Sequence, residues 1–180
     1  MSEPRIVLCT LLLNEMEHLP RLYEQHRNWP GLVRWVFVEA ADFQYAKVNP
    51  HRVSDLGLSV DGTPSFLYSL MKNDGRIRYL PHGMSFHRDP AQGKCAARNR
   101  YLRAADDDRP DFLVVVDADE FYPHEMQARI NAAMASMPFH KRKNRLPFAG
   151  AGGIEPKNTS ALASGGSARV WSGPSVTFAP

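Results

Sequence analysis

The chain has few cysteines and no long hydrophobic run, and both absences narrow what it can be. Its 180 residues include only Cys9 and Cys95, which excludes a scaffold held together by disulfides and is typical of free thiols in a reducing compartment. The longest apolar stretch near the N-terminus, residues 6–13, is too short to cross a bilayer. Neither a basic segment nor a small-residue cleavage site accompanies it, so we expect a cytoplasmic protein without a signal peptide. Loose attachment to a membrane surface is compatible with this location.

An excess of positive charge is also lacking from most of the chain. Residues 1–140 hold 16 basic and 18 acidic side chains, whereas residues 141–180 hold six basic side chains and one acid, Glu155. The sequence pI near 9.0 therefore comes from the C-terminal 40 residues. A mildly acidic body without an aromatic and basic stripe is not typical of nucleic-acid binding, so we expect no nucleic-acid partner.

The composition changes near residue 140. Residues 141–180 contain six Gly, four Pro, five Ser and six Ala, with little periodicity. We expect one domain over residues 1–140, followed by an irregular basic tail over residues 141–180 with only a weak strand signal at residues 168–171.

Strand and helix patterns alternate along the first 140 residues. Apolar runs predict buried strands at residues 5–13, 33–39 and 112–116, and residues 76–80 are predicted as a further, short strand. Helical spacing or caps predict helices at residues 17–29, from Thr63, at 89–104 and from Pro123. Residues 40–58 have no strong periodicity and predict a long loop. The alternation predicts an α/β fold, with a mainly parallel sheet and helices on both of its faces.

Acidic residues follow two of the predicted strands. Glu39 ends the second strand, and Asp117 and Asp119 follow the fourth. Because the carboxyl ends of parallel strands meet at one edge of a sheet, we expect these side chains to share a rim. Carboxylates crowded behind an apolar strand repel one another unless a cation neutralises them, and hard oxygens suit Mg²⁺ or Mn²⁺. The alternative is a solvated acidic turn ahead of the helix at Pro123.

Other segments also have two interpretations. On a helix, Lys94 and Arg98 share a face, where they could hold a diphosphate or form an ordinary exposed basic surface. Residues 59–63 are typical of a turn that leads into a helix cap, and helix N-termini also favour anions. The histidines show no metal-binding spacing, and neither cysteine has an obvious base partner that would make it a nucleophile.

Taken in order, these segments resemble the nucleotide-sugar-binding half of a family-2 type glycosyltransferase with the Rossmann-like GT-A fold. The resemblance covers roughly residues 4–137. The segments that carry it are Asn14-Glu15, Glu39, Ser59-Val60-Asp61-Gly62-Thr63, Ala97-Arg98-Asn99 and Asp117-Ala118-Asp119.

The resemblance implies a role for each matching residue. Asp117-Ala118-Asp119 matches the DxD motif, in which Asp119 would bind Mn²⁺ or Mg²⁺ and Asp117 would bind the ribose or the metal. Glu39 and Asp61 would contact the nucleotide, Glu39 at its base or ribose, and Arg98 would lie near the phosphates. The cation would bridge the diphosphate of a nucleotide-sugar donor and neutralise the departing nucleoside diphosphate. The acceptor would be a glycan, a lipid or a small molecule.

The sequence departs from the family pattern in several places. The family usually has Asp where this chain has Glu39, and it has almost no residues where residues 40–58 separate Glu39 from Ser59. Leu13 stands where many members have an aromatic residue. No acceptor-binding half with a general base is recognisable, so catalytic residues stay unassigned and we expect the chain to be truncated or altered after about residue 140.

These departures leave two other functions open. One is a catalytically inactive fragment that binds nucleotide without the acceptor half and its general base. The other is a phosphotransferase of the haloacid dehalogenase type, whose sites also begin with an apolar strand and Asp-x-Asp. The second is disfavoured because Glu120 and Phe121 stand where that family has a hydroxyl or glycine-rich continuation.

Overall fold

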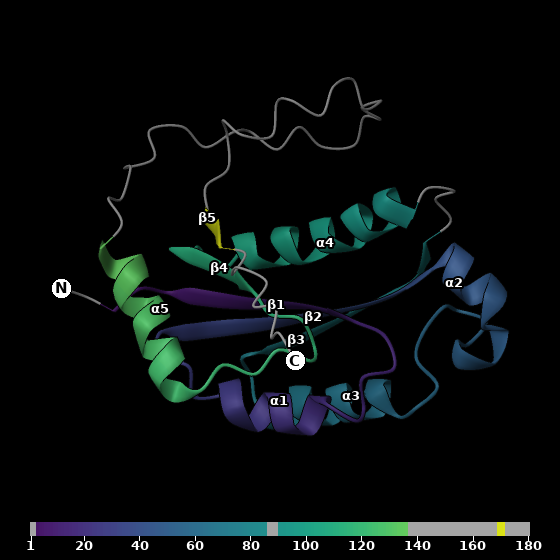
Figure 1. Ribbon diagram of the computed structural model, residues 1–180, viewed down its shortest axis with the longest axis horizontal. Coiled ribbons are helices and arrows are strands. Elements are labelled where there is room, and N and C mark those ends of the chain that lie inside the picture. Colours follow the sequence, from purple (N-terminus) through teal and green to yellow (C-terminus); the bar gives the residue numbers. More distant parts are fainter. Residues whose placement is uncertain (1–2, 86–89, 137–168, 172–180) are drawn as a thin grey trace, which may run out of the picture.

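A computed structural model describes residues 3–85, 90–136 and 169–171 of the chain. Strands and helices alternate along it (Figure 1). The strands are β1 (Ile6–Leu12), β2 (Leu32–Asp42), β3 (Ile77–Ser85), β4 (Phe112–Val115) and β5 (Arg169–Trp171). The helices are α1 (Leu19–His26), α2 (Phe43–Val48), the 3₁₀ turn η1 (Pro50–Arg52), α3 (Thr63–Asn73), α4 (Pro90–Asp106) and α5 (His124–Ser136).

The strands form one parallel sheet in the order β3-β2-β1-β4-β5. The central strand β1 pairs with β2 from Ile6 opposite Leu32 to Leu12 opposite Glu39. On its other side β1 pairs with β4, with Cys9 opposite Val115. The predicted α/β fold with a parallel sheet is confirmed, and all four predicted strands are present.

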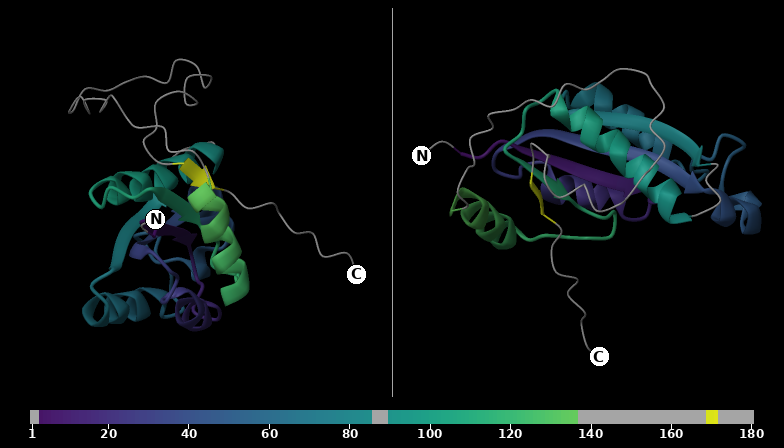
Figure 2. Two further views of the ribbon diagram at one scale, coloured as in Figure 1. Left: turned by 90° about the vertical axis from the view of Figure 1, so that its left-hand side faces the viewer. Right: turned by 90° about the horizontal axis from the view of Figure 1, so that it is seen from above.

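Helices cover both faces of the sheet, as Figure 1 and the two views of Figure 2 show. One face packs under α1, α3 and α5, where Leu22, Leu67 and Met134 join the inward side chains of the strands. The opposite face packs under α4, where Ala97 and Tyr101 cover a second set of strand side chains. Alternate residues of β1 and β4 therefore enter different cores, which is why these two strands are almost entirely apolar.

The predicted loop at residues 40–58 is wrong in part. Strand β2 continues to Asp42, whose Oδ1 accepts hydrogen bonds from the amides of Gln44 and Tyr45 at 2.9 and 3.1 Å and so caps α2. Ala46 and Val53 are buried with Ala41 in a small cluster of their own. A six-residue helix and a single 3₁₀ turn are too short to produce a visible period in the sequence.

Strand β3 also runs further than predicted, through Pro81 and Gly83. Pro81 is tolerated because β3 is an edge strand, where a missing donor is not needed on the open side. Gly83 has a φ of +75°, and a Cβ there would lie 2.5 Å from the Leu56 carbonyl oxygen. The absence of a side chain at residue 83 thus lets the segment before Ser59 lie directly against β3.

The weak strand signal near residue 170 is confirmed by β5, which pairs in parallel with β4. The rest of the predicted tail, and the domain boundary near residue 140, lie outside the described residues. No helix within the described ranges is long and apolar enough to cross a membrane.

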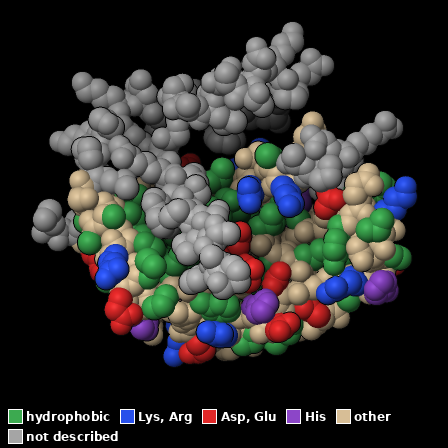
Figure 3. All heavy atoms as spheres, viewed as in Figure 1, with side chains coloured by type: hydrophobic (Ala, Val, Ile, Leu, Met, Phe, Trp, Pro, Cys, Tyr) green, Lys and Arg blue, Asp and Glu red, His purple; other side chains and the backbone are tan. Residues whose placement is uncertain are grey.

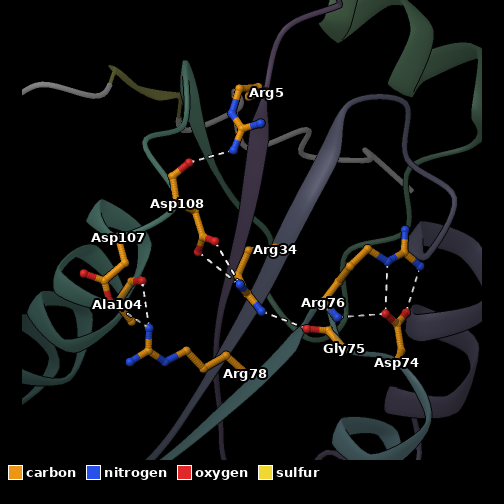
Figure 4. Close-up of polar contacts among 9 residues, drawn as sticks. All are labelled: Arg5, Arg34, Asp74, Gly75, Arg76, Arg78, Ala104, Asp107 and Asp108. Carbon is orange, nitrogen blue, oxygen red and sulfur yellow. Dashed lines mark hydrogen bonds and ion pairs between the residues drawn. The ribbon is translucent and has the colours of Figure 1, made fainter.

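Arginine and aspartate side chains hold together the edge of the sheet where the strands begin (Figure 4). The Arg34 guanidinium donates from Nε and Nη2 to the Asp108 carboxylate at 3.0 and 2.9 Å, and from Nη1 to the Gly75 carbonyl at 2.8 Å. Arg5 donates to the Asp108 carbonyl at 2.9 Å. These contacts tie β2 and the residue before β1 to the loops before β3 and β4.

Asp74 is expected to make the fold sensitive to acid. The Arg76 guanidinium, which donates to both carboxylate oxygens, lowers the pKa of Asp74 to about 2. A lowered folded-state pKa contributes stability above the ordinary value near 4, and this stability is lost as pH falls from about 4 to about 2. We predict that Asp74→Asn lowers the free energy of unfolding by roughly 1 kcal/mol at pH 7 and by much less at pH 2.5, in urea denaturation at the two pH values. An equal loss at both values would contradict the prediction.

Candidate functional site

The order in which strands are added to the sheet reverses between β1 and β4. The chain adds β2 and β3 on one side of β1 and β4 on the other. In open parallel sheets the loops diverge at such a point, and ligands bind outside the strand ends there. The segments that follow these two strands are Leu13–Met16 and Asp117–Tyr122, and acidic side chains gather in the middle of the face in Figure 3, between α4 and α1.

The loop after β1 is fastened to the segment before α3 by hydrogen bonds. Asn14 donates its backbone N–H to Ser59 Oγ at 2.7 Å and accepts the Val60 N–H on Oδ1 at 3.0 Å. The Glu15 N–H is donated to Thr63 Oγ1 at 3.1 Å. Asn14 has a φ of +56°, a conformation that asparagine tolerates better than most residues. Two segments more than 40 residues apart therefore form one side of the rim.

Asp61 lies within this fastening. Its Oδ2 accepts the Met16 N–H at 2.9 Å and its Oδ1 accepts the Thr63 N–H at 3.0 Å. Partial burial acts to raise the pKa of Asp61, but the hydrogen bonds from Met16 and Thr63 outweigh it, so the pKa lies below its ordinary value. Asp61 is consequently an anion at neutral pH, at the N-terminus of α3 and close to the loop after β1.

Glu39, expected to contact the base or ribose, points into the protein. Its side chain is fully buried, with Oε1 accepting the Ser59 N–H and Oε2 accepting the Tyr79 hydroxyl. Burial, together with the hydrogen bond to Glu39, raises the pKa of Tyr79, so the phenol stays a donor. The structure thus places Glu39 beneath the segment that carries Asp61.

Asp117 and Asp119 are both exposed in a tight turn directly after β4. Glu120 shapes this turn, because its Oε2 accepts the Asp117 N–H at 3.0 Å while its own N–H is donated to the Asp117 carbonyl at 3.0 Å. The Tyr122 hydroxyl donates to the same Glu120 oxygen at 3.0 Å. Glu120 is held by the protein, whereas the carboxylates of the Asp-x-Asp pair face outward.

His26 fixes the far end of this turn. The ring is buried among Trp29, Trp35 and Tyr122, with Nδ1 2.9 Å from the Leu22 carbonyl oxygen and Nε2 accepting the Tyr122 N–H at 3.3 Å. Burial lowers its pKa, which keeps the ring neutral and able to accept at Nε2. The histidine is therefore a structural support for the turn.

The pKa of Glu15 indicates that several acidic side chains lie near one another. Burial raises its pKa; His18 counteracts this, and the nearby negative charges of Asp119, Asp61 and Asp117 raise the pKa further. Electrostatic influence of this kind acts only over short distances in salt solution. These three carboxylates therefore lie near Glu15, a fourth acid to which the sequence assigns no role.

Arg98 lies on an exposed position of α4. Burial and the Cys9 thiol raise the pKa of Tyr101 to about 12, while Arg98 lowers it and Asp117 raises it. Arg98 and Asp117 thus both act on the same buried hydroxyl and lie on one side of the molecule. Lys94 is exposed one turn earlier on α4.

Within the part of the chain that the structure describes, protein groups alone do not form a complete metal-ion site. No group of three or more His, Cys, Asp and Glu side chains with metal-binding geometry occurs among residues 3–85, 90–136 and 169–171. The donor chemistry nevertheless fits a hard divalent cation, since Mg²⁺ and Mn²⁺ are commonly held by one or two carboxylates together with water and substrate phosphate oxygens. Asp117 and Asp119 are exposed carboxylates of this type.

The cysteines do not contribute to the rim. Cys9 is buried in β1, and burial raises its pKa well above the ordinary range. Cys95 is exposed on α4. A buried protonated thiol is inert, in agreement with the expectation that Cys9 is not a nucleophile.

Part of the chain matches a known protein family. The family model described as glycosyl transferase family 2 matches residues 57–139. The resemblance stated from the sequence is therefore confirmed over this stretch, which contains Asp61, Arg98, Asp117 and Asp119. No curated protein matches the chain.

One similar solved structure is the mannosyltransferase PcManGT from Pyrobaculum calidifontis, in complex with GDP-Man and Mn²⁺. It is 21% identical, with a TM-score of 0.48. The alignment covers 74% of this chain and 32% of the solved one, so the present chain spans about a third of that protein.

We expect Asn14 to stabilise the loop after β1. We predict that Asn14→Ala lowers the free energy of unfolding by about 1–3 kcal/mol. The substitution removes two side-chain hydrogen bonds, from Nδ2 to the Arg52 carbonyl at 2.7 Å and from the Val60 N–H to Oδ1 at 3.0 Å, and leaves alanine at positive φ. Asn14→Gly, which keeps the backbone conformation, should show the loss of the hydrogen bonds alone. Urea denaturation of both variants measures the two effects, and a neutral Asn14→Ala would show that the loop is not fastened in this way.

Proposed function

We propose that the chain binds a nucleotide-sugar as the donor-binding part of a family-2 type glycosyltransferase, which transfers the sugar to an acceptor. The observation that carries this proposal is that Asp61, bonded to the loop after β1, and Asp117 and Asp119, exposed in the turn after β4, lie outside the ends of two neighbouring parallel strands. The family match supports it, because residues 57–139 include these three carboxylates and Arg98.

In this proposal Asp119, together with Asp117, holds Mn²⁺ or Mg²⁺. The cation would supply positive charge to the diphosphate and so stabilise the departing nucleoside diphosphate. The protein's own contribution is a turn that Glu120 holds closed, so that the two carboxylates are presented together without rearrangement.

The nucleoside would lie along the fastened loops. Asp61 is kept anionic by its hydrogen bonds and can accept from ribose or base donors through its remaining lone pairs. Arg98 on α4 would face the phosphates, where a guanidinium binds oxygen pairs well. Glu39 lies beneath this half of the site, bonded to Ser59.

The Asp-x-Asp pair can be tested by binding. We predict that calorimetry detects UDP- or GDP-sugar binding that requires Mn²⁺, and that Asp119→Ala weakens it at least tenfold while the melting temperature hardly changes, since Asp119 is exposed. Asp106→Ala is a matched control, because Asp106 is an exposed aspartate at the far end of α4.

Each outcome of this titration has a defined meaning. Metal-dependent binding without sugar transfer to any offered acceptor would select the inactive nucleotide-binding fragment. No binding of either nucleotide, with or without Mn²⁺, would refute the proposal. Trapping of a phosphorylated Asp117 would favour the phosphotransferase instead.

A further inference from the structure

We infer that Glu39 is a positioning residue, which holds the nucleotide-binding segment Ser59–Thr63 in place from below. This inference rests on the proposed function, because it assigns the part that Glu39 plays in donor binding. It also explains why a carboxylate is buried at a strand end, where an unpaired charge would be costly.

Both oxygens of the Glu39 carboxylate are already used inside the protein. Oε1 accepts the Ser59 N–H and Oε2 accepts the Tyr79 hydroxyl, and none of the side chain is exposed. A group that contacts a nucleotide must present an atom to the binding surface. Glu39 presents none, so its influence must pass through the residues that it contacts.

The contact with Ser59 leads directly to the rim. Ser59 accepts the Asn14 N–H on Oγ at 2.7 Å, and two residues later Asp61 accepts the Met16 N–H at 2.9 Å. Fixing the Ser59 amide therefore fixes the start of the segment that carries Asp61. Tyr79 extends the chain of contacts to β3, so three neighbouring strands position one loop.

The same contact closes the segment of residues 40–58. After Glu39 the chain passes through the last three residues of β2, α2 and η1 and returns at Ser59, and the bond between these two residues joins the two ends of the segment. Glutamate has one methylene group more than the aspartate expected at this place. We attribute the longer side chain to this geometry, because it reaches both Ser59 and Tyr79 from a strand position.

The test compares variants that keep or break the contacts of Glu39. Glu39→Gln can still accept the Ser59 N–H on its amide oxygen, and its NH₂ group can donate to the Tyr79 oxygen. It should keep nucleotide affinity within about threefold, whereas Glu39→Leu should lose tenfold or more. Tyr79 is buried and does not reach the binding surface, so Tyr79→Phe should lower nucleotide affinity by only about three- to fivefold. Tyr68→Phe is the matched control, because Tyr68 packs edge-on against Tyr79 and is half exposed.

A second readout does not depend on nucleotide. An NMR titration of the Asp61 carboxyl should give a higher pKa in Glu39→Leu and in Tyr79→Phe than in the wild type, because a loosened segment weakens the hydrogen bonds that Asp61 accepts. Tyr68→Phe should leave the titration unchanged. If Glu39→Leu does not fold, Tyr79→Phe and Glu39→Gln still decide the question.

The inference is overturned if Glu39→Gln weakens binding as strongly as Asp61→Ala while Tyr79→Phe changes neither binding nor the Asp61 titration. That result would make Glu39 a direct ligand contact. If the wild type binds no nucleotide, the proposed function fails, but the Asp61 titration still shows whether Glu39 positions the loop.

Discussion

Parallel strand pairing with a reversal at β1 is the constraint on which the rest of the molecule depends. Because all the strands are parallel, their carboxyl ends lie at the same side of the sheet. Because the strand order reverses at β1, the loops after β1 and β4 lead away from each other. The buried faces of β1 to β4 and of the helices that pack on them hold this edge in shape. If β4 did not pair with β1, Glu15 and Asp117 would not lie near each other.

Charged side chains have different surroundings at the two ends of the strands. Where the strands begin, Asp74 and Asp108 are paired with arginines, and these pairs join loops. Where the strands end, Asp61, Asp117 and Asp119 form no ion pair with any other residue of the described ranges. Like charges brought together without protein cations are costly in a structural role and suited to an external cation.

The sequence predicts the strands, the main helices and the acids on the rim, because apolar runs and strand-end carboxylates are local patterns. It does not predict α2, whose six residues leave no period, nor the inward direction of Glu39, which depends on Tyr79 from another strand. Glu15 was visible as Asn14-Glu15 after the first strand, but its environment comes from segments 46 and more residues away. Contacts between distant segments are what local patterns cannot encode.

The most direct test of the central claim is paramagnetic broadening of backbone amide NMR signals by Mn²⁺ in the presence of a nucleoside diphosphate. The account predicts selective broadening of Glu15, of Gly62 and of the turn from Asp117 to Glu120, with the signals of Asp74 and Asp108 at the opposite edge unaffected. Broadening centred on the opposite edge, or none at all near Asp119, would contradict it.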